Sequence, residues 1–136
     1  MVTSSDDTGD LQLAFDAGAM DYLIKPPNMV ELLARHAVTR LVVVPSLLRA
    51  LLDVPGDLRK RLPALRIVVT SGERLREDLL DSFRRRLPGV TLLNLYGSSE
   101  VSGDVTAWEA TASDAESALI GRPIANTRIY VLDAAG

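Results

Sequence analysis

The sequence predicts an α/β protein in which parallel strands alternate with helices. Continuous apolar, β-branched runs of strand length and amphipathic patterns of helix length follow one another along most of the 136 residues. Continuous runs are typical of strands covered on both faces, and strands that alternate with helices form a parallel sheet with right-handed crossovers. We therefore expect a doubly wound parallel sheet in a flavodoxin-like, three-layer α/β/α sandwich.

The expected strands are short and end in polar loops. The first five residues resemble the end of a strand, and five further strands are expected at 22–25, 40–46, 65–72, 90–96 and 127–133. Residues 101–120 lack a clear hydrophobic period, which predicts a long loop between the last two strands.

Four helices are expected between these strands, at 8–20, 26–36, 45–53 and 76–89. Asn28, with Glu31 three residues later, predicts a helix cap, and Ser46 is the expected cap of the third helix. The fourth helix is expected to bury Leu79, Leu80, Phe83 and Leu87. Its run of three arginines, 84–86, is interpreted as a solvated helix end that the macrodipole favours, rather than as an anion site.

Composition excludes several function classes. The chain carries a net charge of −3, which argues against a nucleic-acid partner, and no apolar run reaches the ~20 residues of a membrane span. There is no cysteine and one histidine, so neither a disulfide framework nor a His or Cys metal cluster is expected. A single soluble, cytoplasmic domain over residues 1–136 is the prediction.

Polar side chains follow two of the expected strands. "TSGE" (70–73) and "NLYGSSE" (94–100) both leave parallel strands, and ligands bind beyond the carboxyl ends of such strands. Tyr96 offers an aromatic face, Gly97 allows close backbone approach, and Glu100 offers a carboxylate to a hard cation such as Mg²⁺. The alternative is an ordinary polar turn at the end of a strand, and spacing alone leaves both open.

The stretch "LLNLYGSSEVSGDVT" resembles the fifth core motif, Asn-x-Tyr-Gly-Pro-Thr-Glu, of the adenylation domains of nonribosomal peptide synthesis. Here serines stand at the proline and threonine positions. "VTRLVVVPSLLRALL", "LPALRIVVTSGERL" and "IGRPIANTRIYVLD" follow the order of the same family. The resemblance covers roughly residues 30–136 and favours peptide synthetases over acyl-CoA ligases.

This resemblance implies roles for individual residues. Tyr96 would pack against adenine, Ser99 would contact the α-phosphate and Glu100 would hold Mg²⁺. The implied nucleotide-binding set, with Glu100 as the metal ligand, is Ser71, Gly72, Glu73, Asn94, Tyr96, Gly97 and Ser99. The implied amino-acid pocket is Thr70, Leu95, Gly103 and Asp104, although Leu95 is equally explained by core packing.

Other motifs of that family are not found in the sequence. These are the lysine-bearing phosphate loop, the Tyr-x-Thr-Gly-Asp ribose motif and the small domain with the catalytic lysine. Such groups position the substrates and stabilise developing charge. We therefore expect no required cofactor, weak binding of ATP or AMP with Mg²⁺, and no catalytic residues or turnover in this part of an enzyme.

The first 35 residues resemble a different family, the response-regulator receiver domains. In "DAGAMDYLIKP" and the residues before it, Thr3, Tyr22 and Lys25 match the switch threonine, the switch aromatic and the phosphate-pairing lysine. The acceptor aspartate would precede residue 1, so a phosphorylation-responsive receiver is the least favoured hypothesis, and Lys25 is interpreted as a solvated strand-end charge. Residues 1–36 hold six acids and two bases, whereas the rest hold twelve acids and thirteen bases. This shift in charge is a further indication of two origins.

Two hypotheses remain from the sequence. The first is an engineered chimera, with residues 1–35 from a receiver and 36–136 from an adenylation subdomain, that folds without turnover. The second is an adenylation subdomain that keeps weak nucleotide binding and part of an amino-acid pocket. An exposed sheet edge would also allow a homodimer.

Overall fold

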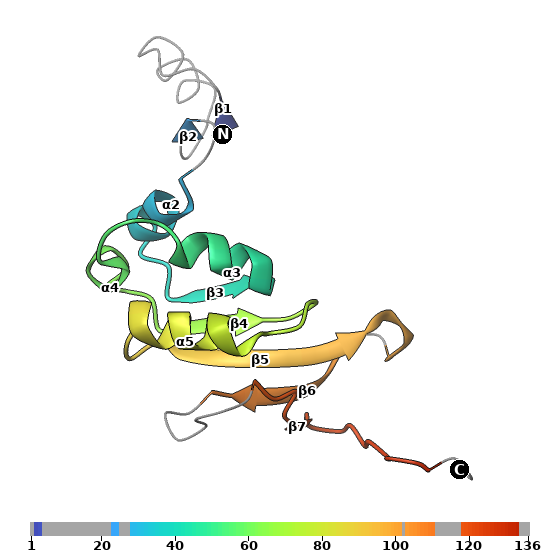
Figure 1. Ribbon diagram of the computed structural model, residues 1–136. Coiled ribbons are helices and arrows are strands. Elements are labelled where there is room, and N and C mark those ends of the chain that lie inside the picture. Colours follow the sequence, from blue (N-terminus) through green and yellow to red (C-terminus); the bar gives the residue numbers. More distant parts are fainter. Residues whose placement is uncertain (1, 4–22, 25–27, 102, 111–117, 134–136) are drawn as a thin grey trace.

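The computed structural model describes residues 2–3, 23–24, 28–101, 103–110 and 118–133 (Figure 1). Tyr22 and Lys25, the first and last residues of the strand expected at 22–25, lie outside these ranges, as does the helix expected at 8–20. The described residues contain no helix long and apolar enough to cross a membrane.

The centre of the fold is a mixed sheet of five strands. In spatial order these are β3 (Arg40–Val43), β4 (Ile67–Thr70), β5 (Thr91–Ser98), β6 (Gly103–Glu109) and β7 (Arg122–Pro123). The first three strands are parallel, whereas β5 with β6 and β6 with β7 pair antiparallel. The predicted α/β class is confirmed, and β3, β4 and β5 overlap three of the predicted strands.

Two predictions in the C-terminal part are wrong. Residues 103–109, expected in a loop, form β6, which folds back on β5 as a hairpin through the short 3₁₀ helix η1 (Ser99–Val101). Residues 127–133, expected as the last strand, adopt no regular structure, and Val131 is 96% exposed there. The sheet therefore ends in antiparallel strands instead of continuing as a parallel one.

A second, two-stranded parallel sheet lies near the N-terminus. It pairs β1 (Val2–Thr3) with β2 (Leu23–Ile24), apart from the five-stranded sheet. The helix α2 (Met29–Arg35) follows, and the Asn28 side chain accepts from the Glu31 N–H at 3.3 Å, as the sequence predicts. In Figure 1 the β1–β2 pair lies beyond α2, on the opposite side from the large sheet.

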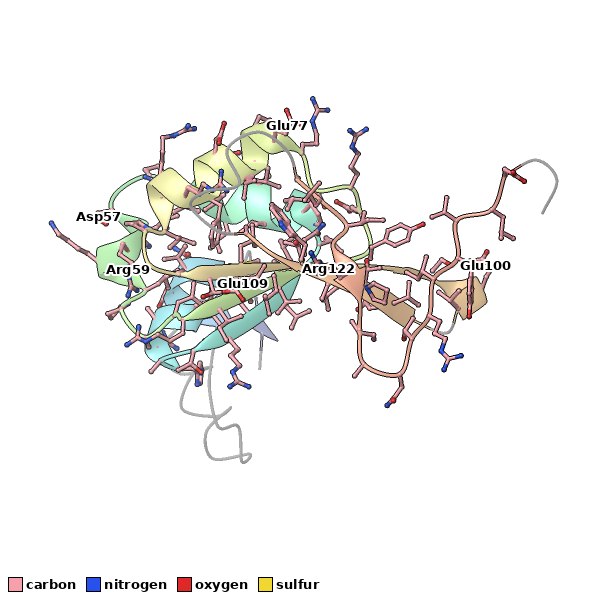
Figure 2. All side chains as sticks on the ribbon, turned by 90° about the horizontal axis from the view of Figure 1, so that it is seen from below. Asp57, Arg59, Glu77, Glu100, Glu109 and Arg122 are labelled. Carbon is pink, nitrogen blue, oxygen red and sulfur yellow. The ribbon has the colours of Figure 1, made fainter. Side chains whose placement is uncertain are left out.

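Helices α3 (Pro45–Leu52) and α5 (Glu77–Arg86) contact each other and cover one face of the sheet, and α4 (Leu58–Arg61) lies beside them (Figures 1 and 2). On that face Val43, Val68 and Leu92 are buried, together with the four apolar residues predicted for the last helix, which are Leu79, Leu80, Phe83 and Leu87. The alternating side chains of the opposite face are more open, and Val42 is 71% exposed. Within the described part of the chain, the core therefore lies between the sheet and the layer formed by α3 and α5, and Val30, Leu33 and Leu58 of α2 and α4 belong to it.

The arginine run at the end of α5 was interpreted as solvated, and for Arg86 this is wrong. Its guanidinium donates to the carbonyl oxygens of Leu52 at 3.0 Å and Gly56 at 2.7 Å, and also to that of Val54. Leu52 ends α3, so one side chain supplies donors to carbonyls that a helix end leaves without partners. Arg86 thus joins the ends of α3 and α5.

Candidate functional site

The site is built where β4 ends, beside the middle of β5. Thr70 and Asn94 are register partners in these strands, and the Thr70 hydroxyl donates to Asn94 Oδ1 at 3.1 Å. Both side chains are buried, at 0% and 6% exposed. Two buried polar side chains that are hydrogen-bonded to each other fix the end of β4 against β5.

A cavity of about 520 Å³ lies beside this end of β4. Gly72 and Glu73, from the loop after β4, line it together with Tyr96 and Gly97. The expectation that "NLYGSSE" leaves a strand is wrong for its first five residues, because β5 continues to Ser98. Asn94 and Leu95 also line it, and so do four residues absent from the predicted site, namely Arg74, Leu75, Ala118 and Ile120. Its volume lies in the range of small-molecule sites, and Tyr96, 50% exposed, adds an aromatic face.

Gly97 is required by the geometry of the β5–β6 hairpin. The register shifts between Tyr96 and Gly97, and a Cβ atom on Gly97 would lie 1.8 Å from the Gly103 carbonyl oxygen. A side chain here would force the two strands apart. The glycine therefore allows β6 to approach β5 immediately after the Tyr96 ring.

Six of the predicted residues do not line the cavity: Ser71, Ser99, Glu100, Thr70, Gly103 and Asp104. Ser71, from the implied nucleotide set, instead donates to Asp104 Oδ1, from the implied amino-acid pocket, at 2.6 Å. Thr70 is fully buried behind Asn94, which makes it a supporting residue rather than a lining one. The two implied sets are thus joined by direct hydrogen bonds.

Glu73 lines the cavity and also forms hydrogen bonds with Ser46. One carboxylate oxygen accepts from the Ser46 N–H and the other from the Ser46 hydroxyl, both at 2.9 Å. The prediction that Ser46 caps this helix is wrong, because Val44 occupies the cap position without a side-chain bond and Ser46 lies in the first turn. Glu73, from the loop after β4, supplies the acceptor for the first turn of α3, and this bond fixes the loop to the helix.

Glu100 lies in η1, beyond the ends of the hairpin strands. Figure 2 shows it on the far side of Arg122 from Asp57 and Arg59. A hydrogen bond from the Ser98 side chain is the main cause that lowers the pKa of the Glu100 carboxyl, so the group is ionised near neutral pH. No cluster of three or more metal-ligating side chains occurs in the described part of the chain, so a cation at Glu100 would need other ligands, such as phosphates and water.

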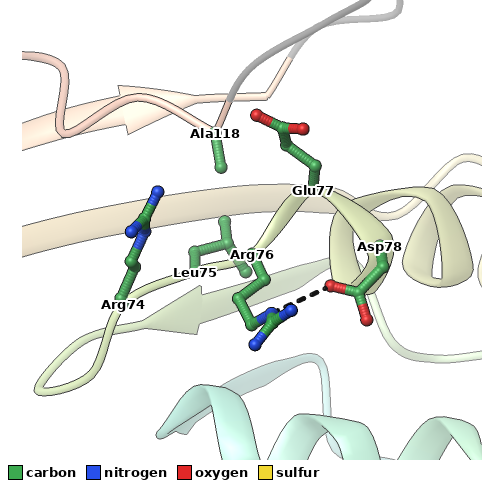
Figure 3. A pocket seen from close by; sticks show the side chains of 6 residues that line it. All are labelled: Arg74, Leu75, Arg76, Glu77, Asp78 and Ala118. Carbon is green, nitrogen blue, oxygen red and sulfur yellow. Dashed lines mark ion pairs between the residues drawn. The ribbon is translucent and has the colours of Figure 1, made fainter.

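A second cavity of about 430 Å³ adjoins the first and shares Arg74, Leu75 and Ala118 with it (Figure 3). Arg76, which also lines it, contacts Asp78 at 3.4 Å. Arg74 and Leu75 directly follow "TSGE", so extending that motif by two residues would have found them. Ala118 and Ile120 carry no local signal, because their place in the wall depends on contacts distant in sequence.

The sequence profile of the family described as AMP-binding enzyme matches residues 13–136. The chain belongs to the AMP-binding enzyme family. This match includes all the residues that line the larger cavity.

Curated relatives of the chain include nonribosomal peptide synthetases. Phosphinothricin tripeptide synthetase PhsB of Streptomyces viridochromogenes is 45% identical over 109 residues, which are 80% of the chain and 9% of the relative. Indigoidine synthase of Dickeya dadantii is 38% identical over 79% of the chain and 7% of its own length. Ebony of Drosophila melanogaster, a β-alanyl-bioamine nonribosomal peptide synthetase, is 42% identical over 80% of the chain and 14% of its own length. The chain therefore spans less than a sixth of each of these proteins.

Solved structures agree with this family. The nonribosomal peptide synthetase FmoA3 in its α-methyl-L-serine-AMP-bound form is 28% identical, with a TM-score of 0.66 over 83% of this chain and 14% of that one. Holo-PA1221, which contains adenylation and PCP domains, is 25% identical with a TM-score of 0.70 over 85% of this chain and 20% of that one. The chain thus has the fold of part of an adenylation domain.

The comparisons do not support a receiver segment or a chimera. The family match begins at residue 13, well inside the segment 1–35 that was compared with a receiver. CmiS6, a solved structure 27% identical with a TM-score of 0.62, covers 90% of the chain. Thr3 lies in β1, paired with Ile24, and the switch role implied for it has no support from these matches.

Proposed function

We propose that the chain is part of an amino-acid-activating adenylation domain and binds ATP or AMP weakly in the 520 Å³ cavity. The observation that carries this proposal is that the "TSGE" loop and the "NLYG" part of β5 line one cavity, with Tyr96 in its wall. Base stacking on such a ring and close approach at Gly97 suit a planar purine. The nucleotide-bound relatives of the same family support the choice of ligand.

Tyr96 and Leu95 in the cavity wall, and Ser99, Glu100 and Asp104 in the hairpin outside that wall, would divide between the parts of the two substrates. Tyr96 would contact the base, and Ser99 would donate to the α-phosphate. Glu100 would hold Mg²⁺ together with phosphate oxygens and water, as Mg²⁺ sites with one or two carboxylates do. Asp104 and Leu95 would form part of an amino-acid pocket, and the nature of that amino acid is left open.

Turnover by this chain alone is not part of the proposal. Its sequence lacks the phosphate-loop lysine and the ribose-binding aspartate that the family uses to position and stabilise the reacting groups. We expect no amino-acid-dependent exchange of pyrophosphate into ATP above a blank without protein. Exchange well above the blank would contradict this.

Isothermal titration with AMP and with ATP–Mg²⁺ tests the binding. We expect dissociation constants on the order of millimolar, because the cavity supplies part of the nucleotide contacts and the phosphate-loop and ribose motifs are not found in the sequence. Tyr96→Ala should abolish measurable binding. The matched control is Tyr130→Ala, because Tyr130 is 73% exposed and lies in the irregular C-terminal segment. Equal binding by Tyr96→Ala and the unmodified chain would overturn the proposal.

A homodimer through a sheet edge stays a prediction. Among the described residues, β3 has β4 as its one neighbour in the five-stranded sheet, so a second copy could pair with its other side. Light scattering coupled to size exclusion, over a range of protein concentrations, measures the association.

A further inference from the structure

One wall of the larger cavity comes from a segment far along the chain from the two loops. Ala118 and Ile120 line the cavity, and they precede β7 at the outer edge of the sheet. The segment 118–121 has no helix or strand hydrogen bonds of its own. Its position therefore depends on hydrogen bonds from side chains of the sheet.

The first contact comes from β5. Asn94 Nδ2 donates to the Leu119 carbonyl oxygen at 2.8 Å, while Asn94 Oδ1 accepts from Thr70. The Thr70 hydroxyl thus fixes which way the amide faces, and the amide reaches the segment across the end of the sheet. Asn94 is 6% exposed, so this bond is sheltered from competing water.

The second contact comes from β6. The Thr106 hydroxyl donates to the Ile120 carbonyl oxygen at 2.5 Å, and Thr106 is 1% exposed. Gly121 follows, where a Cβ atom would lie 2.0 Å from the Ala107 carbonyl oxygen, so the backbone passes directly over β6. Two consecutive carbonyls, of Leu119 and Ile120, are thus each held by one buried side chain.

We propose that Thr106 and Asn94 are positioning residues that hold residues 118–121 as a wall of the ligand cavity. Asn94 also lines the cavity, whereas Thr106 does not. Thr106 is also the register partner of Tyr96 in β5. The route through the Ile120 carbonyl is therefore identified by a change at residues 119–121 that accompanies the change in affinity. This inference rests on the proposed function, in that the ligand is taken to be a nucleotide.

Thr106→Val tests the inference, because valine keeps the shape of threonine and removes the hydroxyl. Amide hydrogen exchange should become faster at residues 119–121 in this variant, and Thr106→Ser should restore the slower rates. Loss of one net hydrogen bond corresponds to about a three- to tenfold change in equilibrium. We expect ATP–Mg²⁺ affinity to weaken by about that factor in Thr106→Val and to recover in Thr106→Ser.

Val30→Ala is the control for general destabilisation, since Val30 is buried in α2 and does not line the cavity. It should lower the free energy of unfolding and leave ATP affinity unchanged. If Thr106→Val exchanges at the original rates, or binds ATP as the unmodified chain does, the inference is wrong while the proposed function stands. If Val30→Ala weakens ATP binding as much as Thr106→Val, a specific role of Thr106 is likewise wrong. If the unmodified chain binds no nucleotide, the proposed function fails, and the inference about a ligand wall fails with it.

Discussion

The Ser71 hydroxyl donates a 2.6 Å hydrogen bond to Asp104, although the two residues lie 33 positions apart in the chain. Ser71 begins the loop after β4, and Asp104 lies at the start of β6. The bond therefore joins the loop that lines the cavity to the hairpin that carries Tyr96 and Gly97.

The first prediction concerns the energy of this bond. Ser71→Ala and Asp104→Ala should each lower the free energy of unfolding, and the double variant should lose less than the sum. We expect a coupling energy of about 0.5–1 kcal/mol from a double-mutant cycle in urea, as for an ordinary hydrogen bond. Additive losses would show that the pair contributes nothing in solution.

Glu73 should stabilise the start of α3. Glu73→Ala leaves the Ser46 N–H and hydroxyl without this acceptor, and loss of a helix cap costs about 1 kcal/mol. Glu73→Gln retains one acceptor oxygen and should lose less. Glu109→Ala is the control, as an exposed carboxylate at the end of β6. Urea unfolding measures all three, and an equal loss in Glu73→Ala and Glu109→Ala would contradict the capping role.

Arg86 should be the most important of the three arginines that end α5. Its guanidinium donates hydrogen bonds to the carbonyl oxygens of Leu52, Val54 and Gly56. Arg86→Ala should therefore lower the free energy of unfolding by about 2 kcal/mol. Arg85→Ala, one position earlier and exposed, should change it by less than about 0.5 kcal/mol. Equal effects of the two substitutions in thermal and urea unfolding would show that the hydrogen bonds of Arg86 do not stabilise the fold.

The Arg49–Asp78 pair should make stability depend on pH. A hydrogen bond from Arg49, at 2.5 Å, is the main cause that lowers the pKa of the Asp78 carboxyl below its ordinary value of 3.8. Because the folded-state pKa is the lower one, ionised Asp78 stabilises the fold above the ordinary value. This contribution is lost as pH falls from about 4 through the folded-state pKa.

Asp78→Asn should therefore show a shallower fall of unfolding free energy below about pH 4 than the unmodified chain. Asp81→Asn is the matched control, because the ion pair of Asp81 with Arg84 is longer, at 3.9 Å. Urea titrations at several pH values between 7 and 3 provide the comparison. Identical pH profiles for Asp78→Asn and the unmodified chain would exclude a role for this pair.

The parts of the fold that could be predicted from the sequence depend on local patterns. Continuous apolar runs predicted β3, β4 and β5, and helical spacing predicted the buried face of α5. The β6 strand was missed because its buried positions include Thr106, whose hydroxyl is satisfied by the distant Ile120 carbonyl. A polar residue at a buried position hides the alternation that identifies a strand.

The opposite error occurred at residues 127–133. This stretch has strand-forming side chains, but Tyr130 and Leu132 are 73% and 70% exposed, and no neighbouring strand pairs with it in the described structure. Strand propensity expresses packing on a sheet and does not form a strand without a partner. Likewise the two motifs predicted six of the ten residues of the cavity wall, whereas Ala118 and Ile120 reach it through contacts that no local pattern encodes.

A ¹⁵N–¹H correlation spectrum titrated with ATP–Mg²⁺ shows whether nucleotide binds in the 520 Å³ cavity. We predict progressive shifts at 72–75, 94–100 and 118–120, the segments around the cavity, with Tyr96→Ala as the control that removes them. A well-dispersed spectrum that does not change with nucleotide, or changes at residues away from these three segments, would contradict the account.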